Sequence, residues 1–179
     1  MTRCFIALNF TPKVISGIES FSDLLKKQNL IEAKYTSDEN LHLTLKFLGD
    51  VKDLDKVKDA LKTVKFNAFD SKLAKAGTFG KTFIRIIWLD LESKELFDLQ
   101  KEVDKSLKGQ FECETQFSSH VTVARLKAVR DRTRLVEFIE TYNKKTKPVE
   151  FKVDSFFLMK STLGPSGPKY SIIEEYKLN

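Results

Sequence analysis

Several residue types and features are scarce in this 179-residue chain, and each shortage narrows what it can be. The two cysteines, Cys4 and Cys113, are too few for a disulfide framework and form no Cys-x-x-Cys pair, so both are predicted to be buried free thiols. No apolar run approaches the roughly 18 residues of a membrane span. The N-terminal apolar run is too short for a signal peptide and lacks a cleavage site of small residues. We therefore expect a cytoplasmic protein.

The sequence has no charged tail, although its net charge is +6. Residues 1–90 carry 15 Lys or Arg against 11 Asp or Glu, and residues 91–179 carry 16 against 14, so folding must assemble any positive patch. A basic balance favours a polyanionic partner such as RNA, although many Lys-rich proteins bind no nucleic acid. With 41% hydrophobic residues the chain can build one well-buried domain, and without a long coiled-coil pattern we expect a monomer.

Histidine is equally scarce, because the chain has only two. Both occur in the same short sequence pattern, His-x-Thr. His42 is followed by Thr44, and His120 by Thr122, within segments that alternate apolar and polar residues as half-buried strands do. With 13 threonines in the chain, chance would place Thr two residues after both histidines about once in 200 sequences. The repeated His-x-Thr frame is therefore the strongest functional signal.

The remaining chain is predicted as alternating strands and helices from hydrophobic periodicity and turn residues. Strands are expected at 3–10, 41–49, 66–79, 83–89, 119–125, 149–159 and 170–176. Helices are expected from Pro12, with Thr11 as the N-cap, to about residue 28, and at 53–64, 92–107 and 131–142. A polar connection is expected between the first helix and the first His-x-Thr strand, and a turn at 164–168.

The order strand, helix, His-x-Thr strand, helix, strand occurs twice, which indicates an internal duplication. The first strand precedes its histidine by similar distances, 36 residues from Ile6 to His42 and 33 residues from Ile87 to His120. We expect one α+β domain over residues 1–179, with two pseudo-symmetric lobes of mostly antiparallel sheet at about 1–80 and 81–179. Helices would cover the outer faces, and both His-x-Thr faces would line a central cleft.

Two imidazoles facing one cleft can act as a general acid and a general base, because the ordinary histidine pKa lies near 6.5. Such a pair suits transfer at phosphorus, where one ring activates an oxygen nucleophile and the other protonates the departing oxygen. The hydroxyls of Thr44 and Thr122 point the same way as the histidines and can donate hydrogen bonds to phosphoryl oxygens. This scheme requires neither a metal nor another cofactor.

Other residues that carry chemistry fit less well. A metal site joining the histidines to Cys4 or Cys113 lacks any His-x-x-x-His or Cys-x-x-Cys spacing. Residues 77–82, Gly-Thr-Phe-Gly-Lys-Thr, lack the earlier Gly of a phosphate loop, so we predict a turn whose Phe and Lys could line an RNA cleft. Arg125 is five residues after His120, so in a regular strand its side chain would lie on the opposite face. It would share the face of His120 only if the strand ends or bulges, so a phosphate-binding role and a surface role are equally supported. Lys46 is predicted to be an ordinary surface lysine.

The paired motifs resemble the signature of the two-histidine (2H) phosphoesterases. The fuller segments, His-Leu-Thr-Leu-Lys-Phe-Leu-Gly at 42–49 and His-Val-Thr-Val-Ala-Arg at 120–125, are similar to the RNA 2′,3′-cyclic phosphodiesterase branch, formerly called 2′-5′ RNA ligase. The opening strand, the strand around Trp88 and the closing Tyr170 segment are similar as well, so the resemblance spans nearly the whole chain. Ser119 departs from the pattern, because the family often has proline before the second histidine.

The resemblance implies a pseudo-symmetric α+β fold with both motifs lining a central basic cleft. It also implies hydrolysis of a 2′,3′-cyclic phosphate at an RNA 3′ end to a 2′-phosphate, and 2′-5′ joining of RNA halves such as tRNA halves. By this resemblance His42 is the proton donor to the leaving 3′ oxygen and His120 the proton acceptor that activates water. Thr44 and Thr122 would hold the phosphoryl oxygens, with Arg125 supporting them.

Two other functions stay open on the sequence. A 2H enzyme could act on a small cyclic nucleotide or on a 2′-5′ linkage, and comparing cyclic-ended RNA with small cyclic nucleotides would separate these substrates. A non-catalytic RNA-binding protein is suggested by the positive charge and the 15 phenylalanines. Such a protein would bind RNA in a salt-sensitive way, whatever the phosphate state of the 3′ end.

Overall fold

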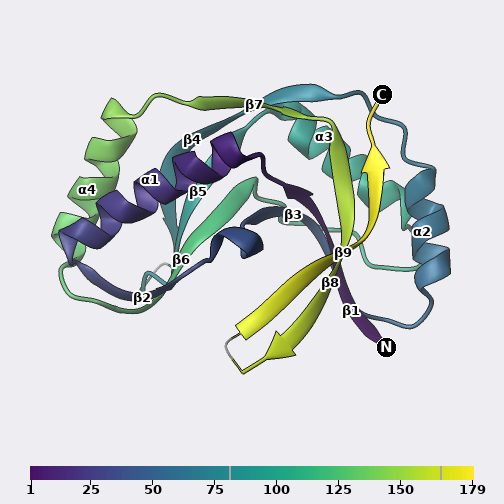
Figure 1. Cartoon of the computed structure of the whole chain (residues 1–179), viewed down its shortest axis with the longest axis horizontal. Coiled ribbons are helices and arrows are strands. Elements are labelled where there is room, and N and C mark those ends of the chain that lie inside the picture. Colours follow the sequence, from purple (N-terminus) through teal and green to yellow (C-terminus); the bar gives the residue numbers. More distant parts are fainter. Residues whose placement is uncertain (81, 166) are drawn as a thin grey trace.

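A computed structural model of the chain describes residues 1–80, 82–165 and 167–179. Within these ranges, nine strands form one sheet and four helices pack against it (Figure 1). The strands are β1 (Thr2–Asn9), β2 (Ile31–Tyr35), β3 (His42–Val51), β4 (Phe69–Phe79), β5 (Ile86–Glu92), β6 (His120–Val129), β7 (Val149–Val153), β8 (Ser155–Gly164) and β9 (Gly167–Lys177). The helices are α1 (Pro12–Gln28), α2 (Leu54–Lys62), α3 (Lys94–Ser106) and α4 (Arg132–Lys145), and a 3₁₀ turn, η1 (Asp38–Asn40), precedes β3.

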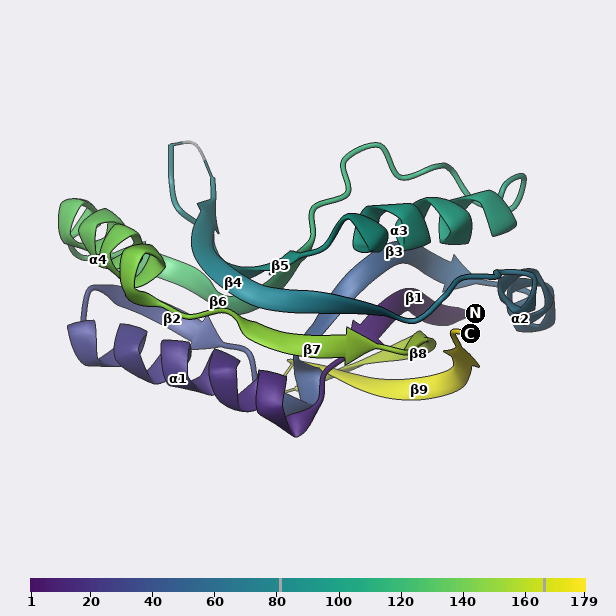
Figure 2. The same ribbon diagram turned by 90° about the horizontal axis from the view of Figure 1, so that it is seen from above.

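The strands pair antiparallel, in the order β7-β4-β5-β6-β3-β1-β8-β9, and β2 adds to β6. This arrangement confirms the predicted α+β class with a mostly antiparallel sheet. Figures 1 and 2 show α1 and α4 at one end of the sheet and α2 and α3 at the other. The two strands that begin with the histidines, β3 and β6, are neighbours at the centre.

Strand pairing does not follow the two sequence halves. β4, the last strand of the first half, pairs with β5 and β7, whereas β8 of the second half pairs with β1. Each half therefore places a late strand beside the first strand of the other half. The expected order of strand, helix, His-x-Thr strand, helix and strand is present in both halves, apart from the short β2 and β7 and the final β9. The internal duplication itself stays a prediction.

The helices form where apolar residues recur at helical spacing. Thr11 occupies the N-cap position ahead of Pro12, as predicted for α1, although its side chain makes no capping hydrogen bond. Asp53, Ser93 and Asp131 cap the other three helices by accepting a backbone N–H bond near the helix start. The buried stripe of α1 shows the pattern, since it consists of Val14, Ile18, Phe21, Ser22 and Leu25.

The sheet has two unlike faces. On one face Leu43, Val121 and other strand residues pack with the helices into the main core. Because side chains alternate along a strand, the residues next to these point to the opposite face. That face carries the histidines and a small second cluster of Phe5, Ala7 and Met159.

One predicted strand is two strands. The segment expected at 149–159 divides into β7 and β8, which pair with β4 and β1 respectively. The division lies where the apolar alternation changes phase, from Phe151 and Val153 to Phe156 and Leu158. A single strand cannot bury both sets on one face, so the change of phase was the signal for a break.

A second difference concerns the connection after α1, which was expected to be irregular and contains β2. Ile31 is buried, and Ala33 and Tyr35 pack against the same core. The segment therefore does show a period of two, which is the signal of a strand.

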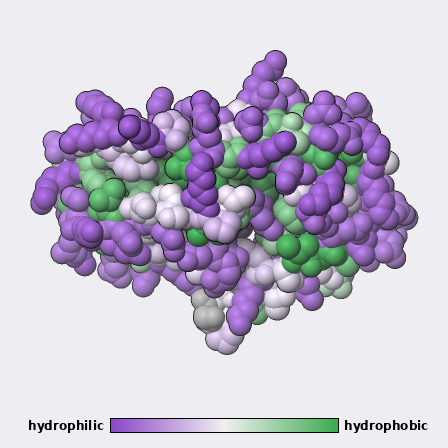
Figure 3. Space-filling model, turned by 45° about the horizontal axis from the view of Figure 1, so that its top comes forward, coloured by the Kyte–Doolittle hydropathy of each residue, from purple (hydrophilic) through white to green (hydrophobic). Residues whose placement is uncertain are grey.

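The outer surface carries many charged side chains, as expected of a chain in which 31% of the residues are charged. Hydrophilic residues cover most of the face that Figure 3 shows, with hydrophobic residues in smaller patches among them. No helix in the ranges that the structure describes is long and apolar enough to cross a membrane.

Candidate active site

The two His-x-Thr motifs meet at the centre of the sheet. β3 and β6 are paired through Leu43 and Val121, whose side chains are 0% and 1% exposed in the core. The flanking histidines and threonines therefore point to the other face of the sheet. The structure thus brings together all four predicted motif side chains.

The antiparallel register also fixes which residues lie across from each other. Since Leu43 opposes Val121, His42 lies across from Thr122, and Thr44 lies across from His120. Each histidine thus has the threonine of the other motif as its cross-strand neighbour. The four residues of the two motifs are thus next to each other on one face of the sheet.

A register shift follows each motif. The β1–β3 pairing shifts between Ile6 and Ala7, so β3 carries one extra residue between Thr44 and Lys46. The β5–β6 pairing shifts between Ile87 and Trp88, so β6 carries one extra residue between Thr122 and Ala124. Such bulges reverse the alternation of the residues that follow.

The first reversal moves Lys46 off the histidine face. Lys46 pairs with Ile6 and is 4% exposed, so the prediction of a surface lysine is wrong. Its ammonium donates to Asp104 Oδ1 and to the Glu112 carbonyl, both at 2.5 Å. A lysine of the first motif therefore binds the segment that leads into the second.

The second reversal brings Arg125 onto the histidine face. Arg125 lies opposite Ile86, which shares a face with Trp88 and hence with Thr122. The guanidinium is exposed, and its charge influences the pKa values of both histidines. The parity objection to Arg125 is thus removed by the bulge, while its phosphate-binding role stays a prediction.

Phe47 occupies the same place in the first motif that Arg125 occupies in the second. Each is the fifth residue after its histidine and follows the bulge. The Phe47 side chain is 71% exposed on the histidine face, and its ring lies 6.2 Å from that of Phe5. Sequence reasoning assigned it no role, although its equal spacing from the histidine was a usable signal.

The two histidines are held by equivalent hydrogen bonds. His42 Nδ1 lies 2.7 Å from the Asn40 carbonyl, and His120 Nδ1 lies 2.9 Å from the Ser118 carbonyl. A carbonyl oxygen can only accept, so each Nδ1 carries a proton and donates it. In the neutral ring, Nε2 then has a free lone pair, which a general base requires.

Aromatic rings fix the orientation of His42. Phe5 lies 4.9 Å from the His42 ring and Tyr170 lies 5.1 Å from it, in an edge-on arrangement. Asn40 joins this side to the hairpin between β8 and β9, since its side-chain amide donates to the Pro168 carbonyl at 3.2 Å. This imidazole is therefore positioned by residues that are far from it in the sequence. The spacing of residues within the motif could not predict these contacts.

His120 has its own aromatic support. Phe79 lies edge-on at 4.9 Å from the His120 ring, and Trp88 lies at 6.4 Å. Gly77 permits this arrangement, because a Cβ there would lie 2.2 Å from the Trp88 ring. On the neighbouring strand, Asp90 opposes His120, and burial raises the pKa of its carboxyl.

Burial lowers the pKa of both histidines from the ordinary 6.5, because a ring shielded from water is less easily charged. The Asn40 and Ser118 carbonyls act in the opposite direction. The positive charge of Arg125 lowers both pKa values further. At neutral pH both rings are therefore mainly neutral in the free protein.

These lowered pKa values predict how stability depends on pH. Between the lowered values and 6.5 the unfolded chain binds protons that the folded chain does not, so the free energy of unfolding falls as pH drops below about 6.5. We expect urea midpoints measured from pH 7.5 to 5.5 to decline less in a His42→Gln/His120→Gln variant than in the wild type. An equal decline in both proteins would contradict the assignment.

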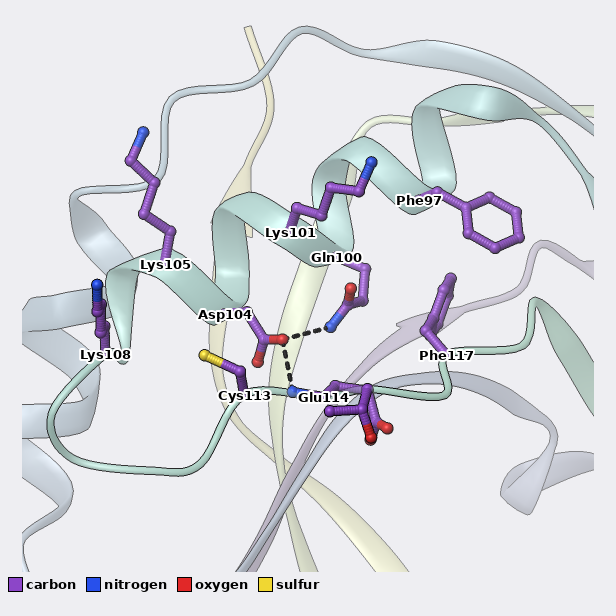
Figure 4. Close-up of a pocket in the computed structure, with 10 residues that line it drawn as sticks. Phe97, Gln100, Lys101, Asp104, Lys105, Lys108, Cys113, Glu114 and Phe117 are labelled. Atoms are coloured by element: carbon purple, nitrogen blue, oxygen red, sulfur yellow. Dashed lines mark hydrogen bonds between the residues drawn. The ribbon is translucent and has the colours of Figure 1, made fainter.

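A cavity of about 540 Å³ lies beside α3, and neither histidine lines it (Figure 4). It is lined by Phe97, Gln100, Lys101, Asp104, Lys105, Lys108, Cys113, Glu114, Thr115 and Phe117. Figure 4 shows Asp104 at its floor, bonded to Gln100 Nε2 at 3.0 Å and to the Glu114 N–H at 2.7 Å. With the Lys46 bond, the carboxylate is already satisfied by the protein itself.

Cys113 at this cavity is exposed, so the prediction that both cysteines are buried holds for Cys4 only. The irregular segment between α3 and β6 leaves its side chain in solvent. Among the residues that the structure describes, no group of three or more His, Cys, Asp or Glu is placed to hold a metal ion. The segment 77–82 was predicted to be a turn, but Gly77, Thr78 and Phe79 belong to β4, so the prediction is wrong for these three residues. Residue 81 lies outside the described residues.

The fold and the paired motifs define the class of this protein, a 2H phosphoesterase. The sequence model of the 2′-5′ RNA ligase superfamily matches residues 18–165, and the chain belongs to this family.

Curated relatives match the chain over nearly its whole length. It is 33% identical to the RNA 2′,3′-cyclic phosphodiesterase of Methanocaldococcus jannaschii, covering 97% of this chain and 99% of that protein. It is also 33% identical to the RNA 2′,3′-cyclic phosphodiesterase of Methanothermobacter thermautotrophicus, covering 98% of each.

Solved structures share the fold. The crystal structure of TT0787 of Thermus thermophilus matches with a TM-score of 0.79 at 22% identity, covering 98% of this chain and 97% of that one. Escherichia coli LigT in complex with phosphate matches with a TM-score of 0.72 at 18% identity, covering 99% and 98%.

Proposed function

We propose that the protein hydrolyses the 2′,3′-cyclic phosphate at the 3′ end of an RNA to a 2′-phosphate. The observation that carries this proposal is the group of four half-buried residues, His42, Thr122, Thr44 and His120, on the face of the sheet away from the main core. Its two imidazoles present equivalent Nε2 atoms, as a reaction with one incoming and one departing oxygen requires. The names of the curated relatives support RNA as the substrate.

The proposed reaction needs one neutral and one protonated imidazole. His120 Nε2 takes a proton from water as the water oxygen attacks phosphorus. The bond between phosphorus and the 3′ oxygen breaks, and His42 gives its proton to that oxygen. The resemblance to the family assigns these two roles, because the hydrogen bonds of the two rings are nearly the same.

The other motif residues would stabilise the charge that develops on phosphorus. Thr44 and Thr122 can each donate a hydroxyl hydrogen bond to a non-bridging oxygen. The exposed guanidinium of Arg125 adds a positive charge that lowers the pKa of the free histidines. A bound phosphate diester would offset that effect, which would help one ring to be protonated in the complex.

The same geometry would accept a different nucleophile. A ribose 5′-hydroxyl in place of water would attack the same phosphorus and leave a 2′-5′ linkage between two RNA ends, such as tRNA halves. We propose this ligation as a secondary reaction of the same site. We also propose that the protein is a monomer and that it is cytoplasmic.

The deciding experiment is to incubate the protein with an RNA ending in a 2′,3′-cyclic phosphate, in EDTA, and to identify the product. Conversion to a 2′-phosphate is expected even in EDTA, because the proposed mechanism uses only side chains of this protein and no metal ion. A 3′-phosphate product would contradict the proposed leaving group. Bound but unconverted RNA would favour the non-catalytic alternative. Turnover of small cyclic nucleotides alone would favour another 2H substrate.

A further inference from the structure

The arginines are concentrated in one part of the molecule. The chain has 31 Lys and Arg residues, of which only six are arginines. Apart from Arg3, all of them lie at Arg85 or close behind the second motif, as Arg125, Arg130, Arg132 and Arg134. Lysines, in contrast, are spread over the whole chain. Because the two basic residue types are distributed differently, we looked for a function that needs the guanidinium group of arginine and not only a positive charge.

The fold gathers these arginines at one end of the sheet. Arg85 precedes β5, and its carbonyl accepts the Leu126 N–H of β6 at 2.8 Å. Arg130 ends the β6 segment, and its side chain bonds Asn29 beside the start of β2. Arg132 begins α4 and donates to the Thr82 carbonyl at 3.2 Å.

All five of these side chains are exposed, and the group begins at the active site. Arg125 lies on the histidine face, and the β6 strand leads from it to Arg130. Five strand residues span about 16 Å, so the two arginines are far enough apart to contact different phosphates of one nucleotide chain. Figure 1 shows the end of β6, the start of β2 and α4 together at the left of the view.

Three acidic residues lie near the arginines, namely Glu32, Asp131 and the exposed Glu137, which follows Arg134 by three residues on α4. Glu32 on β2 pairs with Lys127 at 3.6 Å, and the Asp131 carboxylate accepts the Arg134 N–H as the cap of α4. These contacts leave the guanidinium of Arg134 without a side-chain partner among the described residues. The surface is therefore positive after its internal pairs are counted.

We propose that Arg85, Arg130, Arg132 and Arg134 bind the phosphates of the RNA strand that precedes the cyclic end. This arginine surface, together with Arg125, would direct the strand along β6 toward the start of α4. Guanidinium groups suit the task, because their planar donors match two phosphate oxygens at once. The proposal rests on the proposed function and adds that the preferred substrate is a polynucleotide and not a cyclic mononucleotide.

The test compares two triple variants with equal loss of charge. Arg85→Gln/Arg130→Gln/Arg134→Gln removes three charges from the arginine surface. Lys101→Gln/Lys105→Gln/Lys108→Gln removes three exposed charges from α3 and its end, at the cavity of Figure 4. KM is measured for a 12-nucleotide RNA with a cyclic end and for a 2′,3′-cyclic mononucleotide.

We expect the arginine variant to raise KM for the 12-nucleotide RNA about tenfold or more and to leave the KM for the mononucleotide within about twofold. The lysine variant should change neither by more than about twofold. Equal effects of the two variants on the RNA would overturn the proposal. So would an equal effect of the arginine variant on both substrates, because the arginines would then act through the catalytic site.

A binding measurement separates this proposal from the proposed function. A 12-nucleotide RNA that already ends in a 2′-phosphate cannot react, so its affinity reports on binding without the chemical step. Each lost phosphate contact should reduce the slope of log affinity against log salt by about 0.7, so the arginine variant should lose up to about 2. An unchanged slope would overturn the arginine surface, even if the wild type hydrolyses cyclic ends. A reduced slope would support it, even if no cyclic end is hydrolysed.

Discussion

Replacing either His42 or His120 by alanine is expected to reduce turnover of an RNA 2′,3′-cyclic phosphate by about 10²–10⁴-fold. The loss should be of similar size at the two positions, because the hydrogen bonds of the two rings are nearly equivalent. Single-turnover rates with saturating RNA measure the chemical step directly. RNA affinity should change little, since the imidazoles act on the reacting bond.

The control for this experiment is a measurement of stability, which shows whether the variants remain folded. Both rings lie on the face away from the main core, so the alanine variants should unfold at urea midpoints close to that of the wild type. A wild-type rate in either variant would contradict the acid–base assignment. The dependence of the rate on pH gives a second check. One limb of the profile should come from each histidine, so each variant should lose the limb of the histidine that it lacks.

Replacing Lys46 by methionine is expected to destabilise the protein by about 3–5 kcal/mol, the effect typical of breaking a buried ion pair. The Lys46 and Asp104 side chains are 4% and 11% exposed. Burial by itself raises the pKa of Asp104, but the bonds from Lys46, the Glu114 N–H and Gln100 together lower it. Without Lys46 the carboxylate would be left buried and only partly satisfied. Urea denaturation at pH 7 measures the loss.

A second variant distinguishes a buried charge from lost packing. In Lys46→Met/Asp104→Leu neither charge is present, so much of the lost stability should return. Lys105→Met, at an exposed position on the same helix as Asp104, should change the free energy of unfolding by at most about 0.5 kcal/mol. If the double variant were no more stable than Lys46→Met, the loss would not come from an unpaired Asp104.

The sequence was sufficient for the parts of the site that follow a simple period. The two His-x-Thr strands were identifiable because Leu43 and Val121 are core residues, so the alternation around them is regular. The helices were identifiable for the same reason, from stripes such as that of α1. These elements are each determined by residues close together in sequence, which is why local patterns predict them.

The bulges could not be predicted in this way. Lys46 and Arg125 each follow an extra residue in a strand, and this residue is defined by the pairing partner and not by the strand itself. Strict alternation would therefore place Lys46 on the histidine face, whereas the bulge turns it toward the core. Rings such as Tyr170, which contacts His42 from the far end of the chain, depend on the tertiary fold in the same way.

The exchange of strands between the two halves has a consequence for synthesis on the ribosome. β1 is translated long before its neighbour β8, which includes Met159 opposite Phe5. One edge of β1 must therefore wait, unpaired, while more than a hundred further residues are translated. An unpaired strand edge can associate with other chains. The nascent chain is thus exposed to misassembly at this edge until β8 has left the exit tunnel.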